Sequence, residues 1–201
     1  MRGTHGWCRR RPPTTLLRAA LRYASHGWPV VPGTFAGATE GSHACRRVAC
    51  LVRGAHPAVP DWPTACTVEP GRIAQWWARD RYLIVLPTGI AFDALEVPAD
   101  LGAAVRQELV RAHGGPTAPI ALAPNGRWQV LVSPGARLRA ELADRAGVML
   151  HGLGSWVAGP PSPLPTGAMR WLVPPQAVNW TPADAGLVQW TLTTFVRRRT
   201  R

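Results

Sequence analysis

Short apolar segments with strand character follow amphipathic helical segments in an irregular order along this chain. The clearest strand-like segments, each bounded by turn-forming or polar residues, cover positions 82–86, 92–97 and 128–132. The clearest helical segments, in which apolar residues recur every three or four positions, cover 14–26, 70–78 and 100–112. Because the two kinds of segment do not alternate strictly, we expect an α+β domain with one mixed β-sheet flanked by helices, and not a doubly wound parallel fold.

Weaker patterns complete the expected architecture. Further short strands are expected at positions 28–31, 118–122, 147–150, 155–158 and 169–173, and a helix at 136–145. Thr14 or Thr15 is expected to cap the first helix, which Gly27 ends. Thr181-Pro182 is expected to begin a last helix. The core candidates of that helix are Leu187, Trp190 and Leu192.

The length and the charge distribution predict one domain with basic ends. A chain of 201 residues has room for one substantial core, and we assign that domain to residues 14–196. The net charge of +12 lies mainly at the ends, with six arginines in residues 1–22 and four in 197–201. We expect residues 1–13 to form a disordered basic arm and 197–201 a basic tail. Such ends suit phosphate contacts, although a purely solubilising role fits them equally.

The distribution of apolar residues argues against a membrane protein. Apolar residues make up 46% of the chain, which excludes a disordered composition, but none of the apolar runs is long enough to span a bilayer. Arg18 and Arg22 interrupt the apolar residues near the N-terminus, so a signal peptide is not expected. We therefore expect a cytoplasmic protein.

A cysteine- and histidine-rich loop stands out because it has no periodicity. Residues 33–66 form a long irregular segment, which in a compact domain needs a special reason. His43, Cys45, Cys50 and His56 follow the pattern H-x-C-x4-C-x5-H, and a tetrahedral zinc ion bound by these four would order the loop at 41–66. In the alternative interpretation these are ordinary loop residues. A disulfide is disfavoured in a reducing cytosol, and Cys66 is a spare ligand candidate.

Several segments, in order, resemble the N-terminal domain of bifunctional DNA primase/polymerases, of the archaeo-eukaryotic primase-like superfamily. They begin with Ala20–Ala24 leading into Gly27–Pro32 and the loop ending Gly54–Pro57. Leu86–Gly89 is similar to the strand-ending A-T-G of the family. The most specific segment, Gly152–Ser162, is close to G-x-G-x-V-x-x-P-P-S. Many members carry C-x-C-x4-C-x5-H in the loop, so the resemblance also implies zinc, with His43 in place of the first cysteine.

The resemblance implies nucleotidyl transfer, which needs two divalent ions held by carboxylates. The family uses an acidic pair at i, i+2 on one strand and a third acid on a later strand. Glu96 matches the first acid, but Pro98 stands at the second position and Met149 at the third. Trp128 occupies the position of the nucleotide-contacting histidine. Asp93 lies three residues from Glu96, so in a regular strand the two point to opposite faces.

We therefore expect a primase/polymerase-like domain with a degenerate metal site that binds DNA or nucleotide. Its candidate binding residues are Arg127, His151 and Ser162, the last in a turn that shapes the pocket wall. One alternative is an active enzyme in which Glu96 and Asp93 hold Mg²⁺ or Mn²⁺, and another is a regulatory protein-binding domain without nucleic-acid affinity. Replication proteins are the expected protein partners. The simpler interpretations are that Glu96 is a plain strand-edge carboxylate, that His151 has a structural role and that Arg127 is solvated.

Overall fold

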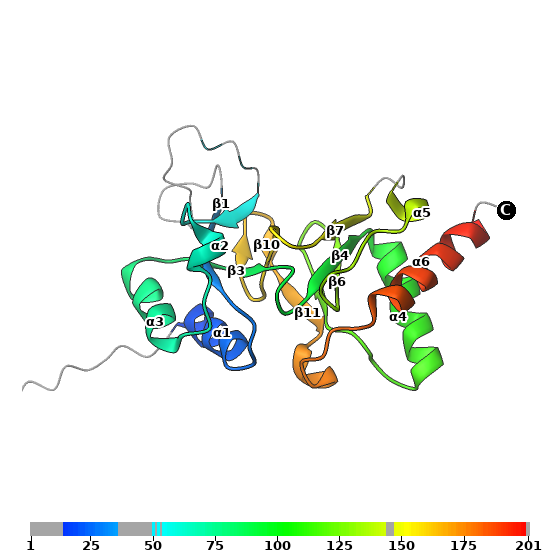
Figure 1. Ribbon diagram of the computed structural model, residues 1–201, viewed down its shortest axis with the longest axis horizontal. Coiled ribbons are helices and arrows are strands. Elements are labelled where there is room, and N and C mark those ends of the chain that lie inside the picture. The colour runs from blue at the N-terminus through cyan, green and yellow to red at the C-terminus, as the bar shows by residue number, and fades with distance from the viewer. Residues whose placement is uncertain (1–13, 36–49, 51, 53, 144–146, 200–201) are drawn as a thin grey trace, which may run out of the picture.

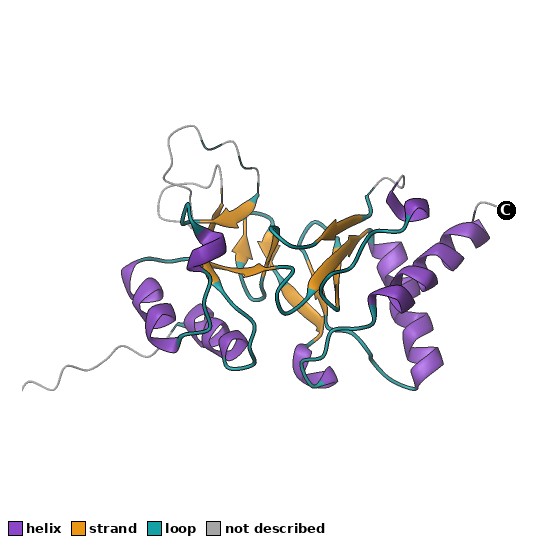
Figure 2. Cartoon of the chain, in the orientation of Figure 1, coloured by secondary structure: helices purple, strands orange, loops and turns teal. Residues whose placement is uncertain are grey.

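Most helices lie at the two ends of the molecule, and the strands lie between them (Figures 1 and 2). The computed structural model describes residues 14–35, 50, 52, 54–143 and 147–199, so the expected arm at 1–13 lies outside the described residues. One end carries α1 (Thr15–Ala24), α2 (Trp62–Ala65) and α3 (Pro70–Arg79). The other end carries α4 (Ala99–His113), α5 (Ala140–Ala143) and α6 (Ala185–Arg199). Helix α6 therefore continues into the segment expected as a basic tail.

The strands form two main antiparallel sheets and one small hairpin. The first sheet has the order β2-β1-β3-β8 and consists of β1 (Val31–Phe35), β2 (Ala55–Pro57), β3 (Leu83–Pro87) and β8 (Trp156–Ala158). The second has the order β11-β5-β6-β4-β7 and consists of β4 (Asp93–Val97), β5 (Ile120–Leu122), β6 (Trp128–Val132), β7 (Met149–His151) and β11 (Arg170–Val173). The hairpin pairs β9 (Pro163–Leu164) with β10 (Gly167–Ala168).

The α+β class with flanking helices is confirmed, but the strands do not form the single mixed sheet that was expected. The chain leaves the first sheet after β3 and enters the second at β4, returns between β7 and β8, and passes to the second sheet again before β11. The first two of these crossings are joined, because the Thr88 amide donates to Ser155 O at 3.0 Å and its hydroxyl to Gly152 O at 2.6 Å. Gly89 turns the chain with φ +83° and packs so close to Leu153 that a Cβ there would clash. These two crossings therefore meet at one junction between the sheets.

The second sheet separates two apolar cores. On one face, Leu95 and Val130 pack with α4 and α6. On the other face, Ala94 and Leu131 pack with an aromatic cluster from α1, α3 and neighbouring loops that includes Trp28. Because successive residues of a strand point to opposite faces, β4 and β6 supply apolar side chains to both cores.

Elements with strong local signals lie where the sequence predicts them. Thr14 caps α1, since its hydroxyl accepts from the Leu17 amide at 3.1 Å. Helix α3 begins at Pro70, and β6 spans 128–132 as expected. Among the described residues, none of the helices combines the length and the apolar character needed to cross a bilayer.

Elements with weak local signals differ from the expectation. The first strand begins at Val31 and runs on to Phe35, and β2 and α2 lie inside the segment expected to be irregular. Tertiary pairing explains β2, because three of its residues bond to β1. The helix expected at 136–145 is described only as the short α5. The last helix begins at Ala185, after a 3₁₀ turn at Pro175–Val178, and Trp190, expected in the core, is 59% exposed.

Candidate functional site

A cavity of about 520 Å³ opens where the two sheets meet. We call it the Glu96 cavity. Its polar lining comes from strands and turns that are far apart in the sequence. The polar lining residues are Glu96, Asn125, Gln129, His151, Ser155 and Thr166. Trp156 closes one side, held by a hydrogen bond of 2.9 Å from its indole nitrogen to Ala55 O.

The register of the second sheet directs Glu96 into this cavity. Glu96 pairs with Gln129 of β6 and with Met149 of β7, so these three side chains share one face. Ala94 and Leu131 lie further along the same face and are covered by the aromatic core. The covered part of the sheet ends there, and the polar side chains beyond it face the cavity.

Three side chains contact the Glu96 carboxylate, and the longest contact is the 3.4 Å hydrogen bond that Gln129 Nε2 donates to Oε2. The Arg127 Nε donates to Oε1, and His151 Nε2 lies 3.2 Å from Oε2. Burial by itself raises the pKa of Glu96, but the hydrogen bonds from His151 and Arg127 outweigh it and lower the pKa to about 2. The Glu96 carboxylate is therefore ionised at neutral pH, and its oxygens accept hydrogen bonds from neighbouring side chains.

The guanidinium of Arg127 is fixed at the rim of the cavity. It bonds to the Glu96 carboxylate and also donates to the carbonyl of Gly147. The turn before β6 holds its backbone, because the Arg127 amide donates to Asn125 Oδ1 at 3.2 Å. The charge of Arg127 is therefore matched by Glu96 and does not stand free for a phosphate.

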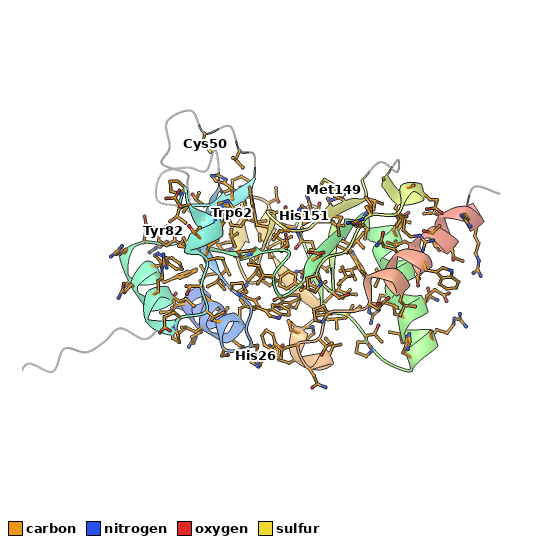
Figure 3. The ribbon with its side chains drawn as sticks, viewed as in Figure 1. His26, Cys50, Trp62, Tyr82, Met149 and His151 are labelled. Carbon is orange, nitrogen blue, oxygen red and sulfur yellow. The ribbon has the colours of Figure 1, made fainter. Side chains whose placement is uncertain are left out.

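His151 links Glu96 to a hydroxyl group. Its Nδ1 lies 3.2 Å from Ser155 Oγ, while its Nε2 faces Glu96. Ser155, His151 and Glu96 all line the cavity, and Figure 3 shows His151 in the middle of the molecule. A hydrogen-bonded chain of hydroxyl, imidazole and carboxylate can orient a bound polar ligand or shift a proton along it.

Asp93 does not reach this cavity. It is 1% exposed, and its Oδ2 accepts from the Ala136 amide at 2.8 Å, while its Oδ1 has no hydrogen-bond partner among the described residues. Strand β4 pairs with β6 without a register shift, so Asp93 and Glu96 lie on opposite faces, as their spacing predicts. The structure therefore does not bring the two acids together.

A comparison with protein families agrees with this architecture. The family model for the bifunctional DNA primase/polymerase, N-terminal domain, matches residues 20–185. The chain belongs to this family. Membership points to a DNA primase/polymerase-like function. No curated protein matches the chain.

Two residues that the sequence resemblance predicts at acidic positions lie near Glu96. Met149 lies directly opposite Glu96 and is 50% exposed. Pro98 follows β4, precedes α4 and lies beside the turn at Gly147. Trp128 lies on the other face of the sheet, where its ring packs against Gly102 of α4. Neither Trp128 nor Met149 is among the residues that line the cavity with Glu96.

Ser162, a further binding candidate in this family member, is fully buried. Its hydroxyl accepts from the Ile84 amide at 2.8 Å and donates to the Ile84 carbonyl at 3.2 Å. The side chain thus ties the turn before β9 to strand β3. It does not line the Glu96 cavity.

The zinc candidates are described only in part. His43 and Cys45 lie outside the described residues. Cys50 Sγ lies 3.4 Å from His56 Nε2, and His56 Nδ1 contacts Gly54 O at 2.9 Å. Within the described ranges no group of three or more His, Cys, Asp or Glu side chains could hold a metal ion. Cys66 bonds to Pro63 O instead, and burial raises the pKa of its thiol.

Four polar residues of the cavity are not among the site residues predicted from the sequence: Asn125, Gln129, Ser155 and Thr166. Gln129 is a buried polar residue inside the apolar strand β6, and this break in the apolar pattern is a signal that it faces something polar. Ser155 lies in the segment that resembles the family, but nothing local indicates its contact with His151. That contact depends on the loop between β7 and β8.

Proposed function

We propose that this family member binds a nucleotide or nucleic acid in the Glu96 cavity and does not carry out metal-dependent nucleotidyl transfer. The proposal combines the family membership with the state of Glu96. Nucleotidyl transfer in this family needs several carboxylates around a pair of divalent cations. In the described residues lining the cavity, Glu96 is the one carboxylate.

The single observation that carries the proposal is the pairing of Glu96 with both Arg127 and His151. A divalent cation at this carboxylate would have to displace the guanidinium or approach its positive charge. Mg²⁺ also dehydrates reluctantly and needs several oxygen ligands. Met149 and Gln129, which share the face with Glu96, supply a thioether and an amide. The residues present therefore do not fit a pair of magnesium ions.

The same lining suits a neutral polar ligand part such as a base or a sugar. Binding sites for small molecules usually measure 300–1,000 Å³ and combine apolar walls with a few polar groups, and a cavity of about 520 Å³ falls in this range. Gln129 and Asn125 offer amide groups, and Ser155 and Thr166 offer hydroxyls. These groups can hydrogen-bond the edge of a base.

Primer extension and binding together test the proposal. With a primed single-stranded template, labelled deoxynucleotides and Mg²⁺ or Mn²⁺, we expect no incorporation by the parent protein. Nucleotide binding should persist, and Ser155→Ala and Thr166→Val should each weaken it roughly fivefold, because a hydrogen bond contributes about 1 kcal/mol. Leu153→Ala is the matched control, since Leu153 is 85% exposed and does not line the cavity.

Two outcomes would contradict the proposal. Incorporation by the parent that disappears in Glu96→Ala would establish the alternative of an active enzyme, although the opposite orientation of Asp93 disfavours the Glu96–Asp93 pair. Loss of all nucleotide and DNA binding would support the alternative of a regulatory domain that binds proteins, for example replication proteins.

We also propose that the loop at 41–66 binds a structural zinc ion. The contact between Cys50 and His56 supports this, because two ligands of one tetrahedral zinc ion lie a similar distance apart. The carbonyl of Gly54 accepts from His56 Nδ1 in the tautomer that leaves Nε2 as a ligand. His43 and Cys45 would complete the site.

A further inference from the structure

A second cavity, of about 470 Å³, lies between α1, the 3₁₀ turn at Pro175–Val178 and the start of β11. We call it the arginine cavity, after Arg18, Arg22 and Arg170 in its lining. Met169 lines both this cavity and the Glu96 cavity and is 1% exposed, so it forms a shared wall between them. Figure 3 shows His26, next to α1, at the lower edge of the view, well away from His151.

The arginine cavity carries a concentrated positive charge. Arg18 and Arg22 are four residues apart on α1 and so share a face of that helix, and Arg170 approaches from β11. All three side chains are exposed. Within the described part of the chain, no ion pair engages any of them, and none of the residues lining the cavity is acidic. The charge is therefore available for an anion.

A neutral group positions one of these arginines. With its amide oxygen turned toward the guanidinium, Gln176 accepts from Arg22 Nε at 3.0 Å and from Arg22 Nη2 at 3.2 Å. An amide orients the guanidinium without cancelling its charge. With Nε and one Nη2 hydrogen engaged by Gln176, the hydrogens on Nη1 and the second hydrogen on Nη2 form the planar fork that can meet a phosphate oxygen, which a flexible ammonium does not offer.

Aromatic rings form the other wall. Tyr23, Trp171 and Trp180 line the cavity. The Trp171 indole nitrogen donates to the Tyr23 hydroxyl at 3.1 Å, which fixes β11 against α1. His26 stacks on Trp180 with 3.7 Å between ring centroids and an angle of 11°. Trp180 also has a left-handed backbone, with φ 61°, as has Asn179 before it, with φ 51°. Such strain in two successive non-glycine residues recurs at functional sites.

We propose that the arginine cavity binds a nucleotide unit, with its phosphate on the arginines and its base against the aromatic wall. The unit belongs either to single-stranded DNA or to a free nucleotide, since both offer the same phosphate and base. Proteins bind single strands through cationic grooves combined with aromatic side chains. This second site goes beyond the function proposed for the Glu96 cavity and does not depend on it.

The test compares two triple variants that remove the same charge. The cavity variant carries Arg18→Gln, Arg22→Gln and Arg170→Gln, and the control carries Arg106→Gln, Arg137→Gln and Arg198→Gln, which are exposed arginines elsewhere. With a fluorescent 15-nucleotide oligo(dT), the cavity variant should bind roughly tenfold or more weakly, and the control only slightly more weakly. The slope of log affinity against log salt should also fall by about 2 in the cavity variant, as for three lost phosphate contacts on a single strand.

A second comparison tests the aromatic wall. Trp180→Leu should weaken oligo(dT) binding roughly fivefold or more, but should leave the binding of an abasic oligonucleotide within about twofold, because only the former offers bases to stack. Thermal melts establish that the variants fold. Because the arginine side chains are exposed, the triple variants keep the proposal testable even if Trp180→Leu is unstable.

A parallel titration with dTTP distinguishes a free nucleotide from single-stranded DNA as the ligand of the arginine cavity. A loss of dTTP affinity in the cavity variant identifies a free nucleotide, and a loss confined to oligo(dT) identifies single-stranded DNA. Equal weakening by the two triple variants, with equal salt slopes, would overturn the proposal, because binding would then reflect overall charge. A negative result for the arginine cavity would not affect the proposal for the Glu96 cavity, since Ser155→Ala and Thr166→Val report on the Glu96 cavity alone.

Discussion

Glu96 of β4 and Met149 of β7 lie directly opposite each other in an antiparallel ladder. The side chains of such a pair are close neighbours on one face of the sheet. The carboxylate at 96 therefore has a thioether beside it where a second acid would have to stand for cation binding.

Met149→Asp should create a weak divalent-cation site beside Glu96. A second carboxylate on the same face competes with Arg127 for Glu96 and adds oxygen ligands. We expect Mn²⁺ affinity, measured by calorimetry, to rise roughly tenfold over the parent, which corresponds to about 1.4 kcal/mol. Leu153→Asp adds the same charge at an 85% exposed position. An equal gain in both variants would mean that overall charge, and not the pairing with Glu96, causes the effect.

The pairing of Glu96 should make stability depend on pH in the acidic range. Its pKa is lowered from 4.5 to about 2 in the folded protein, so its contribution is complete above about pH 4.5 and is lost as the pH falls toward 2. Glu96→Gln should lower the free energy of unfolding by about 1–3 kcal/mol at pH 6. Urea unfolding should show this difference shrinking as the pH approaches 2.5. A difference that stays constant with pH would contradict the role given to the ionised carboxylate.

Asp93→Ala should destabilise the fold without affecting nucleotide binding. The substitution leaves the partly buried amide of Ala136 without its acceptor, and an unsatisfied group removed from water costs about 1–3 kcal/mol. Chemical denaturation measures the loss, and Glu69→Ala, at an exposed position, is the control. Weakened nucleotide binding in a folded Asp93→Ala protein would show that the acid acts in the cavity after all.

Gly102→Ala should be costly because of Trp128. A Cβ at position 102 would lie 2.5 Å from the indole ring, and overpacking of this kind costs about 1–3 kcal/mol. Gly115→Ala is the matched control, since a Cβ there meets nothing within 4 Å. Thermal unfolding should separate the two variants by several degrees. Equal melting temperatures would place Trp128 away from α4.

Metal analysis tests the zinc proposal. Purified parent protein should contain about one zinc ion per chain. Cys50→Ser should lose most of it, while Cys66→Ser, whose thiol bonds to Pro63 O, should keep it. A zinc-free parent protein that is fully folded would refute the proposal.

Local signals explain which parts of the fold were predictable. The start of α1 depends on the hydroxyl of Thr14, and that of α3 on Pro70, both of which act within one turn of chain. The strand at 128–132 follows from its own apolar run. The exposure of Trp190 was not predictable, because it depends on which face of α6 meets α4.

The candidate site also combines features that local sequence predicts with features that depend on tertiary structure. The alternation of side chains along a strand already separates Asp93 from Glu96, because it is a property of the backbone itself. The state of Glu96 is different, since Arg127, in the turn before β6, and His151 of β7 reach it through the register of three strands. The arginine cavity likewise joins residues about 150 positions apart in the sequence.

The amino-acid sequence alone thus determined the α+β class, the resemblance to its family and the orientation of neighbouring side chains, because these depend on interactions between nearby residues. Only the tertiary structure decided that the strands divide into two sheets, that Arg127 and His151 pair with the Glu96 carboxylate, and that three arginines share one cavity. Long-range packing controls these features. Many distant pairings are compatible with the same local pattern, and only the combined burial of both cores selects among them.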